Sequence, residues 1–407
     1  MANDTTEPNA KRARKSDTGY DDDDDVDDDD DDDDADSDSE MEGGEDRLSD
    51  MPNCILIHIM TFLTTKDVLC TSILSRRWKD LWKHVPSLVL RTTDFKVRRM
   101  TRFNEAVSKF LLLRDGSVPL PNVDLHHYGS MRPDILKSVS EYAVMHNVER
   151  LRLVADSFLH LSPAVFSFQT LTSLHLSSCG YELLPRTLGL GALTSLHLRS
   201  FAFSAADNEY ADPFSSCVKL ETLVTDNCSL TNSKILCISN ATLVSLTINS
   251  RKLAFGEEIA LSTPCLCSFS FSGITAAHLS ARNNLSFLKE VTVDFDSCVK
   301  LVDLRETAKR VCLQSAFILI NWLQVFANIR SLTVCSGTLK VLSLTPELLN
   351  TGSPGLNNLQ LLIVKLKNRS ALLHKRHRAT YFRKKADFKT NLVHAGVVDY
   401  LIRNSHF

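Results

Sequence analysis

A six-residue pattern of the form Leu-x-x-Leu-x-Leu recurs between residues 148 and 366, and no other feature constrains the fold as strongly. It is complete at 171–176 and 193–198, which both read LTSLHL, and Val, Ile or Phe replaces leucine in other copies. The central apolar residues of the copies are Leu151, Leu174, Leu196, Leu223, Leu246, Phe269, Val291, Leu332 and Leu362. The first seven are separated by 23, 22, 27, 23, 23 and 22 residues, and the last two gaps are 41 and 30 residues.

One copy of this pattern makes a short strand whose leucines it cannot shield alone, so neighbouring copies stack and bury a continuous core. The spacing is that of a leucine-rich repeat, and Cys179 and Cys228 fall at the Asn/Cys position of that pattern. A β-sandwich also spaces its leucines, but it does not repeat one hexamer so evenly. We therefore predict the α/β class, with a solenoid of parallel strands and a helix near 311–327 in the longest gap.

Residues 47–90 predict three short helices with more apolar surface than so small a unit can bury on its own. Ser49 and Asp50 suit the cap of the first helix, with Pro52 in its opening turn, and Thr64 and Thr65 suit the cap of the second. The apolar residues of the three helices include Ile55, Leu56, Ile59, Phe62, Leu63, Val68, Leu69, Ile73, Leu74, Trp78, Leu81 and Trp82. The surplus apolar face predicts a docking surface.

The same segment resembles the F-box. The motifs that carry the resemblance are Leu48, Pro52, Ile55-Leu56, Ile59, Phe62-Leu63, Lys66-Asp67-Val68 and Ser75-Arg76-Arg77-Trp78. The continuation at 81–88, LWKHVPSL, is similar to the plant F-box/leucine-rich-repeat proteins of the F-box/RNI/FBD type. An ordinary helical cap on the repeats is the alternative interpretation.

The resemblance implies that this segment binds a Skp-type adaptor, which connects the chain to a cullin ubiquitin ligase. The residues that we assign to adaptor binding are Leu48, Pro52, Ile55, Leu56, Ile59, Leu63, Val68, Leu74, Trp78 and Leu81.

Five segments follow from these patterns. Residues 1–46 form an acidic tail that we expect to be disordered, and 47–90 form the F-box. Residues 91–147 hold a linker and the first, irregular repeats, and 148–366 hold the leucine-rich repeats. Residues 367–407 form a basic C-terminal segment. Ten lysines and arginines lie at 365–389, which fits a divergent or truncated cap, a nucleic-acid-binding tail, or a gene product that reads past the usual end.

The charge of the chain is divided unevenly. Residues 1–46 hold 22 acidic and 4 basic residues, whereas the remainder holds 27 acidic and 42 basic residues. Thirteen aspartates lie between Asp21 and Asp34, and they follow a short basic motif compatible with nuclear import. That motif consists of Lys11, Arg12, Arg14 and Lys15. A tail that only increases solubility is the simpler alternative, and we expect the protein in the nucleus, the cytoplasm or both.

Nothing in the sequence predicts catalysis, a cofactor or a metal site. The histidines lack H-E-x-x-H spacing, Gly189-Leu190-Gly191 lacks the third glycine of a dinucleotide loop, and no Cys pair has a partner pair at zinc spacing. We expect the eleven cysteines to be reduced packing residues. Polar residues interrupt the most apolar stretch, 311–329, so we expect a buried helix there and no membrane partner.

In each repeat, the residue between the last two leucines points away from the core, toward the concave face of the solenoid, and we include the residues that flank it. The residues that we assign to target binding on this face are His175, His197, Arg199, Asp226, Asn249, Glu290 and Asp294. They give the face a basic end and an acidic end, which would orient a bound protein. A merely solvated face is the alternative for any single residue.

Together these features predict a non-catalytic substrate receptor of a Skp–cullin–F-box ubiquitin ligase, with an unknown protein as its target. The alternative is a scaffold or chromatin-associated protein that binds basic partners through its polyacidic tail. We do not expect nucleic acid to be a partner, because aromatic residues are few among the basic residues at 365–389.

Overall fold

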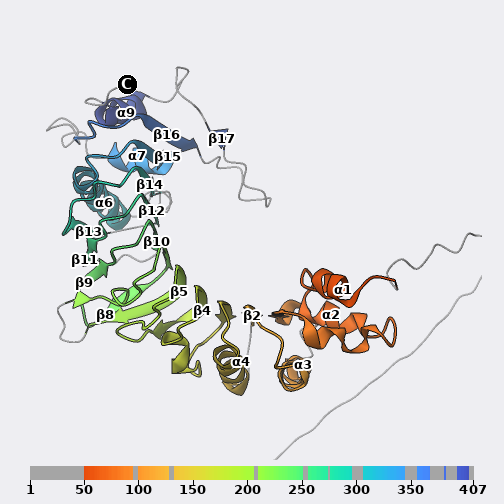
Figure 1. Ribbon diagram of the computed structural model, residues 1–407. Helices are drawn as coiled ribbons and strands as arrows, with labels where there is room; N and C mark the ends of the chain where they lie inside the picture. Colours follow the sequence, from red (N-terminus) through yellow and green to blue (C-terminus); the bar gives the residue numbers. More distant parts are fainter. Residues whose placement is uncertain are drawn as a thin grey trace, which may run out of the picture. The chain divides into compact units, whose positions relative to one another are not determined.

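The computed structural model of the 407-residue chain is shown in Figure 1. It describes residues 50–94, 100–127, 133–205, 210–250, 255–273, 276–295, 306–343, 355–366, 380–381 and 392–402. Leu48, Ser49 and the predicted tail at 1–46 lie outside the described residues, as does the nuclear-import motif. From Pro52 onward, the described residues belong to one compact unit.

The F-box segment contains the three predicted helices. They are α1 (Asn53–Met60), α2 (Thr65–Thr71) and the 3₁₀ helix η1 (Trp78–His84). The prediction for the start of α1 was wrong, because Pro52 lies before the first turn and no side chain caps the helix. The ψ of Pro52 is 147°, an extended value, and its carbonyl accepts the N–H of Leu56 at 3.2 Å. Thr64 caps α2 as predicted, since its Oγ1 accepts the N–H of Asp67 at 3.3 Å.

The repeats form one long sheet, in which eleven described strands are parallel in the order β1-β2-β3-β4-β5-β7-β10-β12-β14-β15-β16 (Figure 1). Their bounds are Ser87–Arg91, Asn122–His126, Arg150–Ala155, Ser173–Leu183, Ser195–Ser204, Thr222–Asp226, Ser245–Ser250, Ser268–Gly273, Glu290–Asp294, Ser331–Cys335 and Leu361–Leu366. A short strand, β8 (Ser229–Thr231), pairs with the second half of β5.

The register of this sheet confirms the repeat pattern. All nine predicted central residues, from Leu151 to Leu362, pair in one continuous row across neighbouring strands. Along β7, β10 and β12 buried residues alternate with partly exposed ones, so the apolar row faces the core and the residues between them face the other side. We call that other side the strand face.

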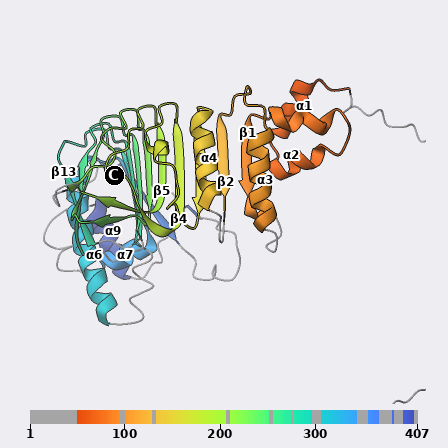
Figure 2. The same cartoon turned by 90° about the horizontal axis from the view of Figure 1, so that it is seen from below.

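Two further strands extend the row toward the F-box. Strand β1 begins before the segment 91–147 that was expected to be irregular, and β2 lies within it. Leu88 of β1 pairs with Val123 of β2, which pairs with Leu151. Helices α3 (Met100–Leu113) and α4 (Pro133–Met145) follow β1 and β2 and lie next to each other (Figure 2). A 3₁₀ helix, η4 (Pro163–Phe166), occupies the corresponding place after β3.

A second sheet in the middle repeats was not predicted. Its parallel strands follow the order β13-β11-β9-β6, with bounds Ala276–Ala281, Phe255–Ser262, Ile235–Ser239 and Tyr210–Ala211. Each of these strands follows a strand of the long sheet in the sequence. In these middle repeats, a second strand therefore takes the place that helices α3 and α4 take in the earlier repeats.

The expected helix in the longest gap is α6 (Glu306–Val325), which packs against β13. Its Trp322 is fully buried, and the indole Nε1 donates a 3.3 Å hydrogen bond to the carbonyl of Ala277. After β15 come α7 (Ser336–Leu342), the short strand β17 (Thr380–Tyr381), which is antiparallel to β16, and α9 (Leu392–Ile402). Helix α9 packs on α7 and buries Val397, Tyr400 and Leu401.

The nine cysteines whose side chains the structure describes are free thiols. Cys217, Cys237 and Cys335 are buried, but Cys54, Cys70, Cys179 and Cys265 are exposed, which corrects the expectation that all of them pack in the core. Cys228 is half-buried, and its Sγ lies 3.5 Å from the carbonyl oxygen of Leu198 in the preceding repeat. Burial raises the pKa of this thiol to about 12.

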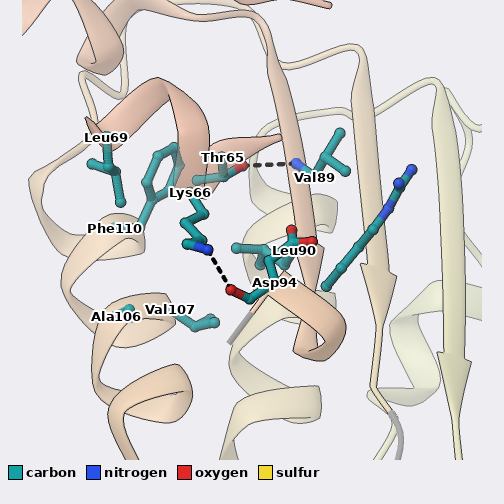
Figure 3. Close-up of a pocket in the computed structure, with 10 residues that line it drawn as sticks. Thr65, Lys66, Leu69, Val89, Leu90, Asp94, Ala106, Val107 and Phe110 are labelled. Atoms are coloured by element: carbon teal, nitrogen blue, oxygen red, sulfur yellow. Dashed lines mark hydrogen bonds between the residues drawn. The ribbon is translucent and has the colours of Figure 1, made fainter. Parts of the chain in front are cut away.

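The F-box and the first strand meet at a small pocket, shown in Figure 3. Lys66 of α2 reaches across it, and its Nζ donates a 2.5 Å hydrogen bond to the carbonyl of Asp94 in η2 (Thr92–Asp94). The lining consists of Thr65, Lys66, Leu69, Val89, Leu90, Arg91, Asp94, Ala106, Val107 and Phe110. These contacts place α2 against β1 and α3.

Candidate functional site

The F-box exposes six large apolar side chains, which we call the F-box apolar surface: Ile55, Ile59, Phe62, Leu63, Ile73 and Leu74. Four of them lie on α1 and the turn after it, and two lie in the turn after α2. Ile73 is 85% exposed and Phe62 is 78% exposed. Apolar side chains this open to water gain free energy when a second protein covers them.

Local contacts hold this surface in place. The opposite face of α1 buries Leu56 and Met60 completely, which leaves Ile55 and Ile59 on the outer face. The Nε of Arg77, just before η1, donates a 2.8 Å hydrogen bond to Oδ1 of Asn53 at the start of α1. Helix α1 is therefore tied to η1 as well as packed on it.

The residues predicted for adaptor binding fall into two groups. The exposed ones are Pro52, Ile55, Ile59, Leu63 and Leu74, and the buried ones are Leu56, Val68, Trp78 and Leu81. The buried four form the interior of the F-box, each with 8% exposure or less, so they support the surface from below in this structure. The tenth, Leu48, lies outside the described residues.

Two members of the F-box apolar surface, Phe62 and Ile73, are absent from that prediction. Phe62 follows Ile55 by seven residues, the spacing of one helix face, and this signal was present in the sequence. Its ring packs edge-to-face on His58, with 5.3 Å between the ring centroids. Ile73 follows Leu69 by four residues and was expected on the second helix, but α2 ends at Thr71, so Ile73 and Leu74 lie in the turn after it.

A second candidate site lies on the strand face of the early repeats, where the register brings charged residues of separate repeats together. We call it the basic cluster; its members are Arg91, His126, Arg152, His175, His197 and Arg199. His175 pairs in register with His197, and the two rings are edge-to-face with their centroids 4.1 Å apart. The Nε of Arg152 lies 3.1 Å from Nε2 of His126.

Two aspartates share this part of the face. Oδ1 of Asp124 lies 3.8 Å from Nε of Arg152, and its Oδ2 lies 3.8 Å from Arg91. Asp226 lies 3.5 Å from Nε of Arg199. These distances exceed the roughly 2.7–2.9 Å of a strong charge-assisted hydrogen bond. The three guanidinium groups are also about half-exposed, so they keep donor capacity for a ligand.

The histidines of the basic cluster are held in the neutral form. Burial first, and then the neighbouring His197, Arg152, His126 and Arg199, together lower the pKa of His175 to about 3. Burial also lowers the pKa of His197, although Asp226 opposes the shift. The charged groups that lower the pKa of His175 are all basic, which marks the position as electropositive.

All seven residues predicted for target binding lie on the long sheet. His175, His197 and Arg199 fall in the basic cluster, and Asp226 pairs in register with Arg199 on one side and Asn249 on the other. Glu290 and Asp294 lie on β14, at the two ends of that strand. The prediction omitted Arg91, Asp124, His126 and Arg152, although Arg152 follows from the first repeat, Leu151-Arg152-Leu153.

Comparison with known proteins agrees with both parts of the fold. The family model of the F-box domain matches residues 48–90. A second model, described as the leucine-rich repeats of the FBD-associated F-box protein At5g56370, matches residues 136–289. The F-box/LRR-repeat protein At3g26922 of Arabidopsis thaliana is 30% identical over 284 residues, which are 66% of this chain and 90% of that protein.

This chain belongs to the plant F-box/LRR family. A second Arabidopsis thaliana relative, the putative F-box/LRR-repeat protein At3g59160, is 27% identical over 349 residues, which are 74% of this chain and 73% of that protein. The F-box/FBD/LRR-repeat protein At4g00160 is 42% identical, but only over 69 residues. Members of this family are generally non-catalytic adaptors, and an F-box implies binding to a Skp1-type adaptor.

Two further observations concern the described part of this F-box/LRR protein. No group of three or more His, Cys, Asp or Glu side chains is arranged there to hold a metal ion. None of the described helices combines the length and the apolar character needed to cross a membrane. The residues predicted for nuclear import, Lys11, Arg12, Arg14 and Lys15, lie outside this part of the chain.

Proposed function

We propose that this protein is the substrate-recognition subunit of a Skp–cullin–F-box ubiquitin ligase, in which the F-box apolar surface binds the adaptor and the strand face binds a target protein. The observation that carries the proposal is the exposure of six large apolar side chains on a helical unit that already has a filled interior. The family membership supports it.

The energetics support binding through this surface. Fully burying one large apolar side chain contributes roughly 1.5–3 kcal/mol, and association costs about 4–15 kcal/mol. Six such side chains contribute at most about 9–18 kcal/mol, which is comparable to the association cost, so a stable complex needs the whole surface and no single residue suffices. The proposed receptor performs no chemistry itself. It acts by proximity, because it holds a target lysine near the ubiquitin carrier that the cullin positions.

The experiment is co-purification of the Skp-type adaptor and the cullin with the full chain from plant cells. The test variant is Ile73→Asp with Leu74→Asp, which places two charges in the F-box apolar surface. The matched control is Leu112→Asp with Leu159→Asp, because these two side chains are 82% and 78% exposed on the repeat side. We expect the test variant to lose adaptor and cullin and the control to keep both.

Retention of adaptor and cullin by the test variant would contradict the proposed interface. Recovery of histones without cullin by the unaltered chain would instead support the chromatin-associated alternative. Mass spectrometry of the same preparations after proteasome inhibition identifies the target, since a degraded partner accumulates under these conditions.

A further inference from the structure

The basic cluster is the part of the strand face with the most distinctive chemistry. It extends over β1, β2, β3, β4 and β5, and β7 contributes Asp226 at its far side. Six neighbouring strands, about 4.8 Å apart, span roughly 24 Å. That length matches an extended segment of several residues better than a single small ion.

The charge of the cluster is incompletely balanced. Three guanidinium groups share the carboxylates of Asp124 and Asp226 at 3.5–3.8 Å. The charged or titratable groups that lower the pKa of His175 are His197, Arg152, His126 and Arg199, and the carboxylate of Asp124 lies 4.0 Å from His126 and 3.8 Å from Arg152. An oxyanion placed over the two histidine rings would face donors on both sides.

The strand face changes character beyond β7. Its outward positions in β10, β12 and β14 are mostly hydroxyl side chains and one amide: Ser245, Thr247, Asn249, Ser268, Ser270, Ser272 and Thr292. These side chains offer hydrogen bonds to an extended backbone without adding charge. Glu290 and Asp294 then place negative charge at the far end, which would repel a ligand that is acidic throughout.

The same rows favour a protein ligand over a nucleic acid. Single strands of nucleic acid bind basic grooves through bases that stack on aromatic side chains. The rows that carry the basic cluster, which end at Ser177 in β4 and Arg199 in β5, hold no Phe, Tyr or Trp. Farther along these strands, Phe201 is buried, and Tyr181 is 49% exposed and accepts a 2.9 Å hydrogen bond from Nδ2 of Asn227. One exposed ring does not provide a series of stacking groups, so the cluster suits an acidic polypeptide better.

We propose that the basic cluster binds an acidic segment of the target protein, with its carboxylates or phosphates over His175 and His197 and its backbone continuing along the hydroxyl-bearing strands. This inference rests on the proposed receptor function and specifies the chemical class of the target. Aspartate, glutamate and phosphoserine share the required oxyanion chemistry, and the probes below separate them.

The test measures binding of fluorescent peptides to the full chain by fluorescence anisotropy. Three peptides of about twelve residues, up to roughly 40 Å long when extended, alternate serine with glutamate, with phosphoserine or with lysine. We expect the two acidic peptides to bind, with affinity that falls as salt rises, and the lysine peptide not to bind. Tighter binding of the phosphoserine peptide would identify phosphate as the preferred group.

The test variant is Arg152→Gln with Arg199→Gln, and the matched control is Arg186→Gln with Arg330→Gln. The control removes the same charge from two exposed arginines outside the cluster. We expect the test variant to weaken binding of the acidic peptides by about tenfold or more and the control to change it by less than about twofold. Equal losses in both variants, or no acidic peptide binding to the unaltered chain, would overturn the inference.

A pH series adds a readout that nonspecific charge attraction does not share. An anion near His175 and His197 raises their lowered pKa values, so binding takes up protons and strengthens as the pH falls from neutral toward the lowered pKa values of the two free histidines. In the variant His175→Asn with His197→Asn this pH dependence should be lost, while Arg91, Arg152 and Arg199 remain. An unchanged pH dependence in that variant would place the anion elsewhere.

The outcome also separates this inference from the proposed function. Loss of acidic peptide binding with normal adaptor binding would contradict only the proposed chemical class of the target. Normal peptide binding in a chain that never recovers the adaptor would leave an anion site on a protein that is not a ligase receptor.

Discussion

The Oγ1 of Thr65, the first residue of α2, accepts a 2.9 Å hydrogen bond from the backbone N–H of Val89 in β1 (Figure 3). Strand β1 is the first strand in the order of the long sheet and pairs only with β2 among the described strands. An N–H on the free edge of such a strand would otherwise have no strand partner. The F-box therefore covers the open edge of the repeat sheet.

Replacement of Thr65 by valine keeps the shape of the side chain and removes the acceptor. Because Thr65 is only 5% exposed, we expect the unfolding free energy to fall by about 1–2 kcal/mol. Thr71→Val on the same helix is the control, because its hydroxyl donates a local 2.7 Å hydrogen bond to the carbonyl of Val68, three residues earlier. Urea denaturation checks the difference, and equal midpoints for the two variants would contradict it.

Trp322 organises the packing between α6 and the late repeats. Its ring packs edge-to-face on Phe271 at 5.0 Å and Phe269 at 5.9 Å between centroids. We expect Trp322→Ala to cost about 3–5 kcal/mol, since it opens a cavity and leaves the Ala277 carbonyl without its indole donor. Phe317→Ala on the same helix is the control, because Phe317 is 53% exposed. Calorimetry should show a large fall in melting temperature for the first variant alone.

The long sheet was predictable because the sequence of each hexamer shows which of its residues are buried. Leucines that alternate with polar residues fix both the strand and its core face, and the spacing fixes the register from Leu151 to Val291. The second sheet carries no comparable signal. Its strand Ile235–Ser239 is a short apolar run, ILCIS, without a repeated hexamer, and such a run does not distinguish a strand from a helix segment.

The candidate site was predictable only in part. Helix α1 is apolar around most of its circumference, so its pattern does not show whether Ile55 or Leu56 faces inward. Packing against η1 decides this and turns Leu56 to the core. The basic cluster depends on register between separate repeats, which brings Arg152 beside His175. That proximity is visible only after the strands have been aligned.

Gly273 and Gly355 both adopt positive φ, at 131° and 71°, but their surroundings differ. A Cβ on Gly273 would lie 1.7 Å from the carbonyl oxygen of Ser250 on the neighbouring strand, whereas a Cβ on Gly355 would meet nothing within 4 Å. We expect Gly355→Ala to cost about 1 kcal/mol of backbone strain and Gly273→Ala to cost more than about 3 kcal/mol. Comparable urea midpoints for the two variants would contradict this difference.

The burial of the His127 side chain predicts how the stability of the fold depends on pH. Its side chain is fully buried beside Phe103, with ring centroids 5.6 Å apart, and neither ring nitrogen has a hydrogen-bond partner in the described part of the chain. Burial lowers its pKa below the usual 6.5, and Asp156 opposes the shift. The unfolded chain therefore binds a proton more readily than the folded chain. Its contribution to stability is complete above about pH 6.5 and is lost as the pH falls below that value.

We expect the unfolding free energy to decline between about pH 7 and pH 5, with a slope of at most about 1.4 kcal/mol per pH unit from this residue. His175, whose pKa is lowered to about 3, adds a slope of the same sign. His127→Leu removes the buried titrating group and should flatten the decline. Phe103→Leu damages the same packing without removing the imidazole, so it should lower stability at every pH and keep the slope. Urea denaturation at several pH values checks this, and an unchanged slope in His127→Leu would show that His127 is not the group that titrates.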